Sequence, residues 1–206
     1  MQVQLVKLEI LLEELGLGPD LFVERYPGAF MVAAGLLAIE EEVKDNEDNE
    51  ENDASDERLI IAPTKPPRDM TRERLDFTTV FKFGRRRAHA TGEPHALAGT
   101  AFRLQPTGDK SHVTVGRSAD CDITVPDRSV SDVHCRIEVT ERGVVVIDLQ
   151  STNGTSINQQ RLEPGAATVL ADEDILSVGR YSFQMLSSAS LYSGLLEVRP
   201  LIQPGS

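Results

Sequence analysis

The sequence has no tryptophan, only two cysteines, and no hydrophobic run long enough to cross a membrane. The longest apolar run, GAFMVAAGLLAI at 28–39, is well short of the roughly 20 residues that a membrane-spanning helix needs. Cys121 and Cys135 do not have the paired spacing of metal ligands, and two cysteines do not make a disulfide scaffold. The N-terminus lacks the basic region and cleavage site of a secretory signal. We therefore expect a cytoplasmic protein without a membrane partner.

Charge is distributed very unevenly. The formal net charge is −12 over 206 residues, but residues 40–57 alone contain eleven Asp and Glu against one Lys. Residues 58–87 contain nine Lys and Arg against three Asp and Glu. Such a block of like charge cannot bury enough apolar surface to offset the entropy of ordering the chain. We expect a disordered linker at 45–76, acidic and then rich in proline and basic residues, followed by a basic arm at 77–98.

The N-terminal 44 residues have the spacing of amphipathic helices. Two apolar stripes recur at helical intervals, one formed by Leu5, Leu8, Leu12 and Leu15 and the other by Phe30, Ala34, Leu37 and Ala38. The spacing predicts a helical segment or hairpin over residues 1–44. A unit this small is not stable alone, so it dimerises, docks on the rest of the chain, or holds a partner.

Residues 99–187 consist of short segments rich in Val, Ile, Thr and Phe, separated by turn residues. Their spacing of about eight to twelve residues is typical of an antiparallel β-sandwich. In CRIEVTERGVVVIDL the alternation predicts an inward face that is formed by Cys135, Ile137 and Val139 and then by Val145, Ile147 and Leu149. Residues 188–206 are assigned to a C-terminal tail.

Three of the connecting loops are rich in hydrogen-bonding side chains. Arg117 follows one strand, Ser131 lies in DRSVSDVHC, and QSTNGTSIN at 150–158 follows a third strand. Arginine offers a planar fork of donors, and hydroxyl and amide groups add further donors and acceptors. These groups suit recognition of an oxyanion beside a peptide backbone. An Asn-Gly pair alone is equally typical of a tight hairpin turn.

Together the segments VGRSADCDITVPDRSVSDVHCRI, DLQSTNGTSIN and ADEDILSVGRYSFQML resemble a forkhead-associated (FHA) domain. The resemblance covers residues 99–187. It implies an eleven-stranded sandwich that binds phosphothreonine peptides through loops at one end, without enzymatic activity and without a cofactor.

The resemblance also assigns roles to single residues. It implies that Arg117 and Ser131 contact the phosphate, that Thr152 lines the same site, and that Asn153 bonds the peptide backbone. Positions that hold the loops in shape are Gly116, His134, Gly154 and Asn158. Asp132 departs from the family, which usually has Arg, Asn or Lys there, and it brings a negative charge close to the expected phosphate.

The function predicted from these features is a bacterial signalling adaptor that acts downstream of a Ser/Thr protein kinase and binds a phosphothreonine-containing protein. Thr78 and Thr79 in DFTTVF are candidate phosphoacceptors, by which the protein's own N-terminal arm would become the ligand in an intramolecular switch. The alternative is a phosphate-independent docking protein that uses the sandwich as a passive surface and forms a homodimer through its N-terminal helices.

Other classes of function have little support. The four histidines His89, His95, His112 and His134 lack metal-ligand spacing, so no metal site is expected. The basic cluster GRRR at 84–87 stands in an acidic chain without interleaved aromatic residues, so no nucleic-acid partner is expected. No set of residues has the arrangement of a catalytic site.

Overall fold

The computed structural model describes residues 3–37, 90–91, 97–105, 112–140 and 143–202. The strands of the larger sheet are β1 (Gln4–Lys7), β2 (Ala29–Leu37), β3 (Ala90–Thr91), β4 (Thr100–Leu104), β9 (Thr155–Ile157), β10 (Gln160–Arg161), β12 (Ile175–Val178) and β13 (Tyr181–Ser187). Those of the smaller sheet are β5 (His112–Gly116), β6 (Ile123–Thr124), β7 (Cys135–Thr140), β8 (Gly143–Asp148) and β11 (Ala167–Leu170). The helices are α1 (Leu8–Glu13), the 3-10 helix η1 (Glu14–Leu17), α2 (Pro19–Arg25) and α4 (Ser188–Ile202).

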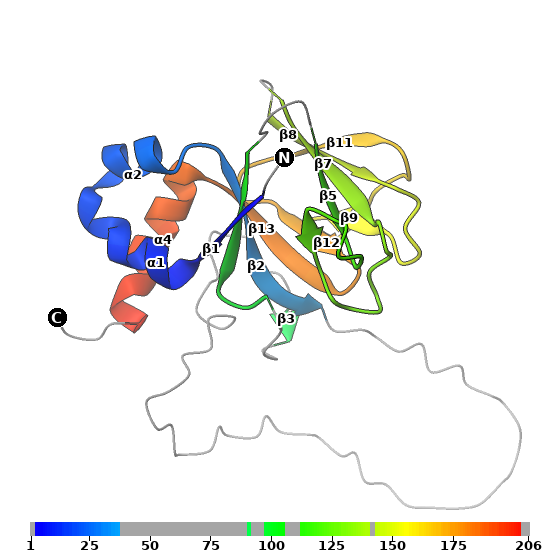
Figure 1. Cartoon of the computed structure of the whole chain (residues 1–206), viewed down its shortest axis with the longest axis horizontal. Helices are drawn as coiled ribbons and strands as arrows, with labels where there is room; N and C mark the ends of the chain where they lie inside the picture. Colours follow the sequence, from blue (N-terminus) through cyan, green and yellow to red (C-terminus); the bar gives the residue numbers. More distant parts are fainter. Residues whose placement is uncertain (1–2, 38–89, 92–96, 106–111, 141–142, 203–206) are drawn as a thin grey trace, which may run out of the picture.

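The two sheets pack face to face as a sandwich, with the helices gathered on one side of it (Figure 1). The larger sheet has the order β1–β4–β2–β13–β12–β9–β10, with β3 paired to β2, and the smaller has the order β11–β8–β7–β5–β6. The mainly β sandwich predicted from the sequence is confirmed. Of the thirteen strands in the described ranges, ten lie within residues 99–187, for which the resemblance implies eleven, and β1, β2 and β3 come from earlier in the chain.

The β7–β8 hairpin shows how the sequence directs side chains into the sandwich. Cys135 and Ile137 are fully buried, as the alternation predicts. On β8 the predicted face is wrong by one residue, because Ile137 pairs with Val146 and Cys135 pairs with Asp148. Thr140 pairs with Gly143, which leaves only two residues between the strands and sets this register. A shift of one residue reverses the face of every side chain, so Val144, Val146 and Asp148 point inward.

Strand β2 corrects the prediction for the N-terminal region. The stripe that begins at Phe30 was expected to be helical, but residues 29–37 form a strand between β4 and β13. Phe30 and Val32 pack in the core shared with the helices, whereas Met31 and Ala33 pack in the core between the sheets. A strand that is buried on both faces has a continuous apolar sequence. Its periodicity therefore does not distinguish a strand from a helix.

A helical layer covers the outer face of the larger sheet. Leu8, Leu11 and Phe22 are fully buried there together with Leu191 and Leu195 of α4. Each such side chain contributes about 1.5–3 kcal/mol. Residues 188–202, which belong to the segment assigned to a C-terminal tail, form the helix α4 that completes this layer. The N-terminal helices therefore dock on their own sheet, which is one of the three alternatives that the sequence left open.

The boundaries of the domains follow from this arrangement. The sandwich contains β2 in addition to residues 99–187, so its sequence is interrupted. The predicted linker at 45–76 lies outside the described residues, as does the arm at 77–98 apart from 90–91 and 97–98. Leu36 and Leu37 of β2 pair with Thr91 and Ala90 of β3, so residues 38–89 leave and rejoin the sheet at one place. Every helix in the described part is too short or too polar to span a bilayer.

Candidate functional site

Three connections meet at one end of the sandwich, and we call residues 117–122, 125–134 and 149–154 the loop end. Arg117 follows β5 directly, and its backbone N–H donates to the Ser131 carbonyl oxygen at 2.9 Å. This bond joins the first connection to the second. Gly116 permits the approach, because a Cβ there would lie 2.2 Å from the Asp132 carbonyl oxygen. The predicted structural role of Gly116 thus has a steric basis in this fold.

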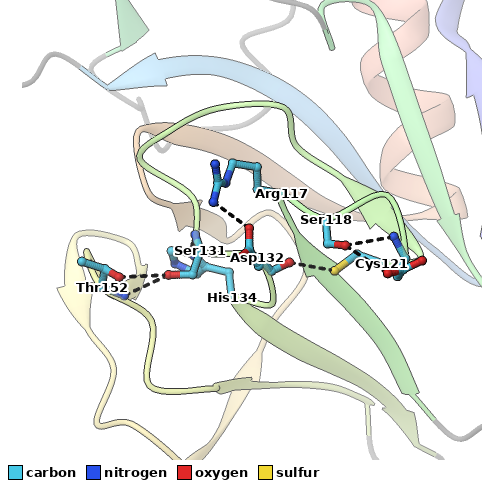
Figure 2. A network of polar contacts seen from close by, with 8 residues as sticks. Arg117, Ser118, Cys121, Ser131, Asp132, His134 and Thr152 are labelled. Atoms are coloured by element: carbon cyan, nitrogen blue, oxygen red, sulfur yellow. Dashed lines mark hydrogen bonds and ion pairs between the residues drawn. The ribbon is translucent and has the colours of Figure 1, made fainter.

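Ser131 joins the second connection to the third. Its hydroxyl oxygen accepts a hydrogen bond from the Thr152 N–H at 3.0 Å, and its hydroxyl donates to Thr152 Oγ1 at 3.3 Å (Figure 2). Arg117, Ser131 and Thr152, which are far apart in the sequence, therefore lie in one hydrogen-bonded group. The arginine side chain and the two hydroxyl groups are donors of the kind that suit an oxyanion.

Asn153 is exposed beside this group. Its Nδ2 donates to the Ser129 carbonyl oxygen at 2.8 Å, which fixes the orientation of the amide. Gly154 has a φ of 81°, a conformation that favours glycine. A Cβ at Gly154 would lie 2.7 Å from the Arg161 guanidinium, so that guanidinium lies against the loop.

His134 is the internal brace of the loop end. It is fully buried, its Nδ1 accepts the Ser131 N–H at 3.0 Å, and its Nε2 lies 3.1 Å from the Gly154 carbonyl oxygen. Since Nδ1 is an acceptor, the ring is the neutral tautomer that donates from Nε2. Burial lowers the pKa of His134, although the Gly154 carbonyl and the Asp148 carboxylate act in the opposite direction.

This brace predicts a loss of stability in mild acid. The unfolded chain takes up a proton on His134 below its ordinary pKa of about 6.5, whereas the folded chain resists it, so stability falls as the pH falls from about 6.5 toward the lower folded pKa. Between pH 7 and pH 5.5 we expect the free energy of unfolding to decrease. Urea unfolding at a series of pH values measures it. His134→Gln should remove this decrease and the matched variant His112→Gln should retain it; an unchanged slope in His134→Gln would contradict the assignment.

Asn158, predicted to hold a loop in shape, lies at a different place from the donor group. It adopts a φ of 50°, its Nδ2 donates to Asp174 Oδ1 at 2.8 Å, and its Oδ1 accepts the Ile175 N–H at 3.0 Å. These bonds tie the β9–β10 turn to β12. Asn158 therefore holds the sheet behind the loop end and does not face the donor group.

Asp148 is a residue that the sequence analysis missed. It is 1% exposed, and its carboxylate accepts hydrogen bonds from the Thr155 hydroxyl at 2.6 Å and from the Ser151 hydroxyl and N–H at 2.5 and 3.1 Å. Burial opposes ionisation of Asp148, but these bonds outweigh it and lower the pKa. The network shapes the connection that presents Thr152 and Asn153. The sequence does carry a signal for this role, because Asp148 is an acidic residue at the end of an apolar strand. The incorrect prediction of the inward face of β8 placed Asp148 on the outer face and so hid this signal.

A second missed group supports Ser129. Arg180 donates from Nε to Asp127 Oδ2 at 2.8 Å, and its backbone N–H donates to Ser129 Oγ at 3.0 Å. Gly179, with a φ of 58°, allows this approach, because a Cβ there would lie 2.6 Å from the Ser129 carbonyl oxygen. The turn between β12 and β13 therefore supports the loop to which Asn153 is anchored.

Arg117 has an ionic partner in this structure. Its Nη2 donates to Asp132 Oδ1 at 2.6 Å, and the two side chains are 46% and 73% exposed (Figure 2). The sequence marked Asp132 as a charge near the expected phosphate, but not as a partner of Arg117. The predicted phosphoacceptors Thr78 and Thr79 lie outside the described residues. Within the described residues no group of three His, Cys, Asp or Glu side chains is placed to hold a metal ion.

Comparison with known proteins shows which family the chain resembles. Residues 113–179 match the model of the FHA domain. The chain is 30% identical over 107 residues to an oxoglutarate dehydrogenase inhibitor of Corynebacterium efficiens, covering 48% of this chain and 73% of that protein. It is 34% identical over 103 residues to a probable serine/threonine-protein kinase, fhkA, of Dictyostelium discoideum, covering 39% of this chain but only 17% of the kinase.

A solved structure gives a similar result. The solution structure of the FHA domain of an Arabidopsis thaliana hypothetical protein is 32% identical, with a TM-score of 0.40, covering 44% of this chain and 75% of that one. The matched stretch is thus less than half of this chain. The N-terminal helices and residues 38–89 lie outside residues 113–179, which match the family model.

Proposed function

Because the chain belongs to the FHA domain family, we propose that its loop end binds phosphothreonine peptides and that the protein is a signalling adaptor downstream of a Ser/Thr protein kinase. The observation that carries the proposal is the hydrogen-bonded group of Arg117, Ser131 and Thr152. Bonds from such donors to a phosphate are charge-assisted and contribute about 1.5–3 kcal/mol each. Asn153, held by Ser129, is positioned beside them for the peptide backbone. The protein recognises a modified partner and does not act on it chemically.

The test is binding of the full chain to degenerate peptide pools, followed by fluorescence anisotropy. The pools differ only at a fixed central residue, which is phosphothreonine, phosphoserine or unmodified threonine. We expect binding of the phosphothreonine pool and none of the unmodified pool. The extra methyl of threonine contributes about 0.8 kcal/mol if buried, so phosphoserine should bind about fourfold more weakly. Equal binding of phosphorylated and unmodified pools would refute phosphate recognition.

A phosphate-independent docking role is the second candidate, and the Arg117–Asp132 ion pair is the observation in its favour. An arginine that is already paired has less to gain from a phosphate. Ile10 and Leu21 on the helices are also exposed, at 51% and 55%, and would supply the surface for a homodimer. Binding of an unmodified partner that survives phosphatase treatment would favour this candidate.

The phosphorylated arm of the chain itself is the ligand that we propose for regulation. Residues 38–89 rejoin the sheet at β3, where Leu36 of β2 pairs both with Thr91 and with Tyr181. Tyr181 directly follows Arg180, which contacts the loop end through Asp127. Thr79 precedes Ala90 by eleven residues, which reach at most about 36–40 Å when extended, whereas Thr91 and Tyr181 lie on either side of Leu36, two strand spacings or roughly 10 Å apart. This geometry supports binding in cis.

Phosphorylation of Thr78 or Thr79 should therefore block the binding of other phosphopeptides. A tethered ligand has an effective concentration in the millimolar range. A separate phosphopeptide with a micromolar dissociation constant should therefore bind the phosphorylated chain at least about 100-fold more weakly than the unphosphorylated chain. Anisotropy with one labelled phosphopeptide, before and after treatment with a Ser/Thr kinase, measures this. Thr78→Ala/Thr79→Ala should not respond to the kinase. If the kinase-treated wild-type chain, with phosphate mapped to either residue, binds the peptide as before, the switch is excluded.

A further inference from the structure

The carboxylate of Asp132 accepts a hydrogen bond from the Arg117 guanidinium, which is the charged donor that we propose for the phosphate. Arg117 Nη2 and Asp132 Oδ1 are 2.6 Å apart at the exposed rim of the loop end (Figure 2). A phosphate and this carboxylate therefore compete for the same guanidinium. Because both side chains are largely exposed, the ion pair is worth little by itself and a dianion can displace it.

The main chain keeps Asp132 at this position. Its carbonyl oxygen accepts the Ser118 N–H at 3.0 Å and the Cys121 thiol at 3.2 Å. The missing Cβ of Gly116 leaves room for the same carbonyl. Rotation of the side chain can move the carboxylate away from Arg117, but the residue itself stays beside it. Every ligand of Arg117 is therefore a neighbour of Asp132.

Displacement leaves the carboxylate without its counter-ion and next to a phosphate of the same sign. Like charges at close range disfavour binding. Asp120, exposed in the neighbouring turn, adds to the negative charge on this side. The Arg161 guanidinium lies against Gly154 in the third connection, and Arg180 is bonded to Asp127. Among the described residues, Arg117 is the cationic partner of Asp132, so a basic side chain of the ligand can take its place once Arg117 binds the phosphate.

We propose that Asp132 is a specificity-determining residue, which weakens phosphothreonine binding in general and selects peptides that carry Lys or Arg close to the phosphothreonine. On binding, Arg117 passes from Asp132 to the phosphate, and the basic side chain of the peptide takes its place beside Asp132. This proposal rests on the proposed phosphothreonine binding and specifies the ligand of that same site.

The experiment compares three phosphothreonine peptide pools, in which the positions flanking the phosphothreonine are enriched in Lys, Ala or Glu, each with a counterpart pool that carries unmodified threonine. Their affinities are measured by anisotropy for the full wild-type chain, for Asp132→Asn and for Glu197→Gln. The last variant removes one negative charge from α4, on the helical side of the molecule (Figure 1). Asp132→Asn changes an exposed side chain and should leave the thermal unfolding midpoint unchanged, which excludes misfolding as an explanation.

We expect the wild-type chain to bind the Lys pool about fivefold more tightly than the Ala pool, the size of effect that an exposed ion pair supports. Asp132→Asn should bind the Ala pool about fivefold more tightly than wild type and should lose the preference for Lys. Glu197→Gln should behave as wild type. The preference should also shrink at high salt, because screening acts on exposed charges.

Two results overturn the proposal, and they are distinguishable. If wild type binds phosphothreonine pools and Asp132→Asn has the same affinities and the same preference, Asp132 has no role in selection while phosphothreonine binding stands. If neither protein binds any phosphothreonine pool above its unmodified counterpart, the proposed function itself fails and the inference fails with it.

Discussion

Replacement of Arg117 by alanine is expected to weaken binding of a phosphothreonine peptide about 100-fold. The guanidinium can donate two parallel hydrogen bonds to a phosphate, and charge-assisted bonds of this kind are worth about 1.5–3 kcal/mol each. The variant also leaves Asp132 without its partner, so its carboxylate would oppose the phosphate more strongly than in the wild-type chain. Isothermal titration of one phosphopeptide against the full chain measures the change.

Arg117→Lys is the informative companion to this variant. Lysine keeps the charge but loses the planar fork, so we expect a loss of about tenfold, between wild type and Arg117→Ala. Arg136→Ala on β7 is the matched control, because it removes one positive charge outside the loop end. Since the Arg117 side chain is about half exposed and its ion pair contributes little to stability, all three variants should remain folded. Wild-type affinity in Arg117→Ala would show that the phosphate binds elsewhere.

Replacement of Asp148 by alanine is expected to lower the free energy of unfolding by about 3–4 kcal/mol. The buried carboxylate accepts three hydrogen bonds from Ser151 and Thr155, and its removal leaves those donors without an acceptor. Leaving a buried donor unsatisfied costs about 1–3 kcal/mol. Urea unfolding measures the change. Peptide binding should weaken as well, because Ser151 directly precedes Thr152.

Asp148→Asn separates charge from shape in the same network. One amide oxygen can still accept a hydrogen bond, so we expect about half of the loss seen in Asp148→Ala. The lowered pKa of Asp148 means that its stabilisation is present above its ordinary pKa of about 3.9 and is lost as the pH falls through the lower folded value. Glu163→Gln in an exposed loop is the control, expected within about 0.5 kcal/mol of wild type. A loss below about 1 kcal/mol in Asp148→Ala would contradict the role of the network.

The sequence predicted those parts of the fold in which one face of a strand is buried. Cys135 and Ile137 alternate with polar neighbours and were placed correctly. Strand β2 was misassigned because both of its faces are buried, by Met31 in one core and Phe30 in the other. Local periodicity carries no information about a second layer. That layer is made by helices from both ends of the chain, which no local pattern links.

The candidate site was predicted in its residues but not in its internal contacts. Arg117, Ser131 and Thr152 are recognisable as donors, and the structure brings them together. Their supports depend on pairings across the fold, such as Arg180 with Asp127, whose positions are far apart in the sequence. The partnership of Arg117 with Asp132 is of the same kind. Chemical type is local and was predictable, whereas which polar groups meet depends on sheet register.

Strand β2 is far in sequence from the strands β4 and β13 between which it lies. The strand lies in the middle of the larger sheet, and residues 38–89 are its covalent connection to β3, with which it also pairs. Lengthening a connection costs only about 0.6 kcal/mol for each doubling of its length, so insertions within residues 38–89 should destabilise the sandwich little. A single proteolytic cut within residues 38–89 would leave two fragments held together by β2 and the helical layer. The residues before and after 38–89 are thus two parts of one fold that associate through the pairing of β2 and through the helical layer.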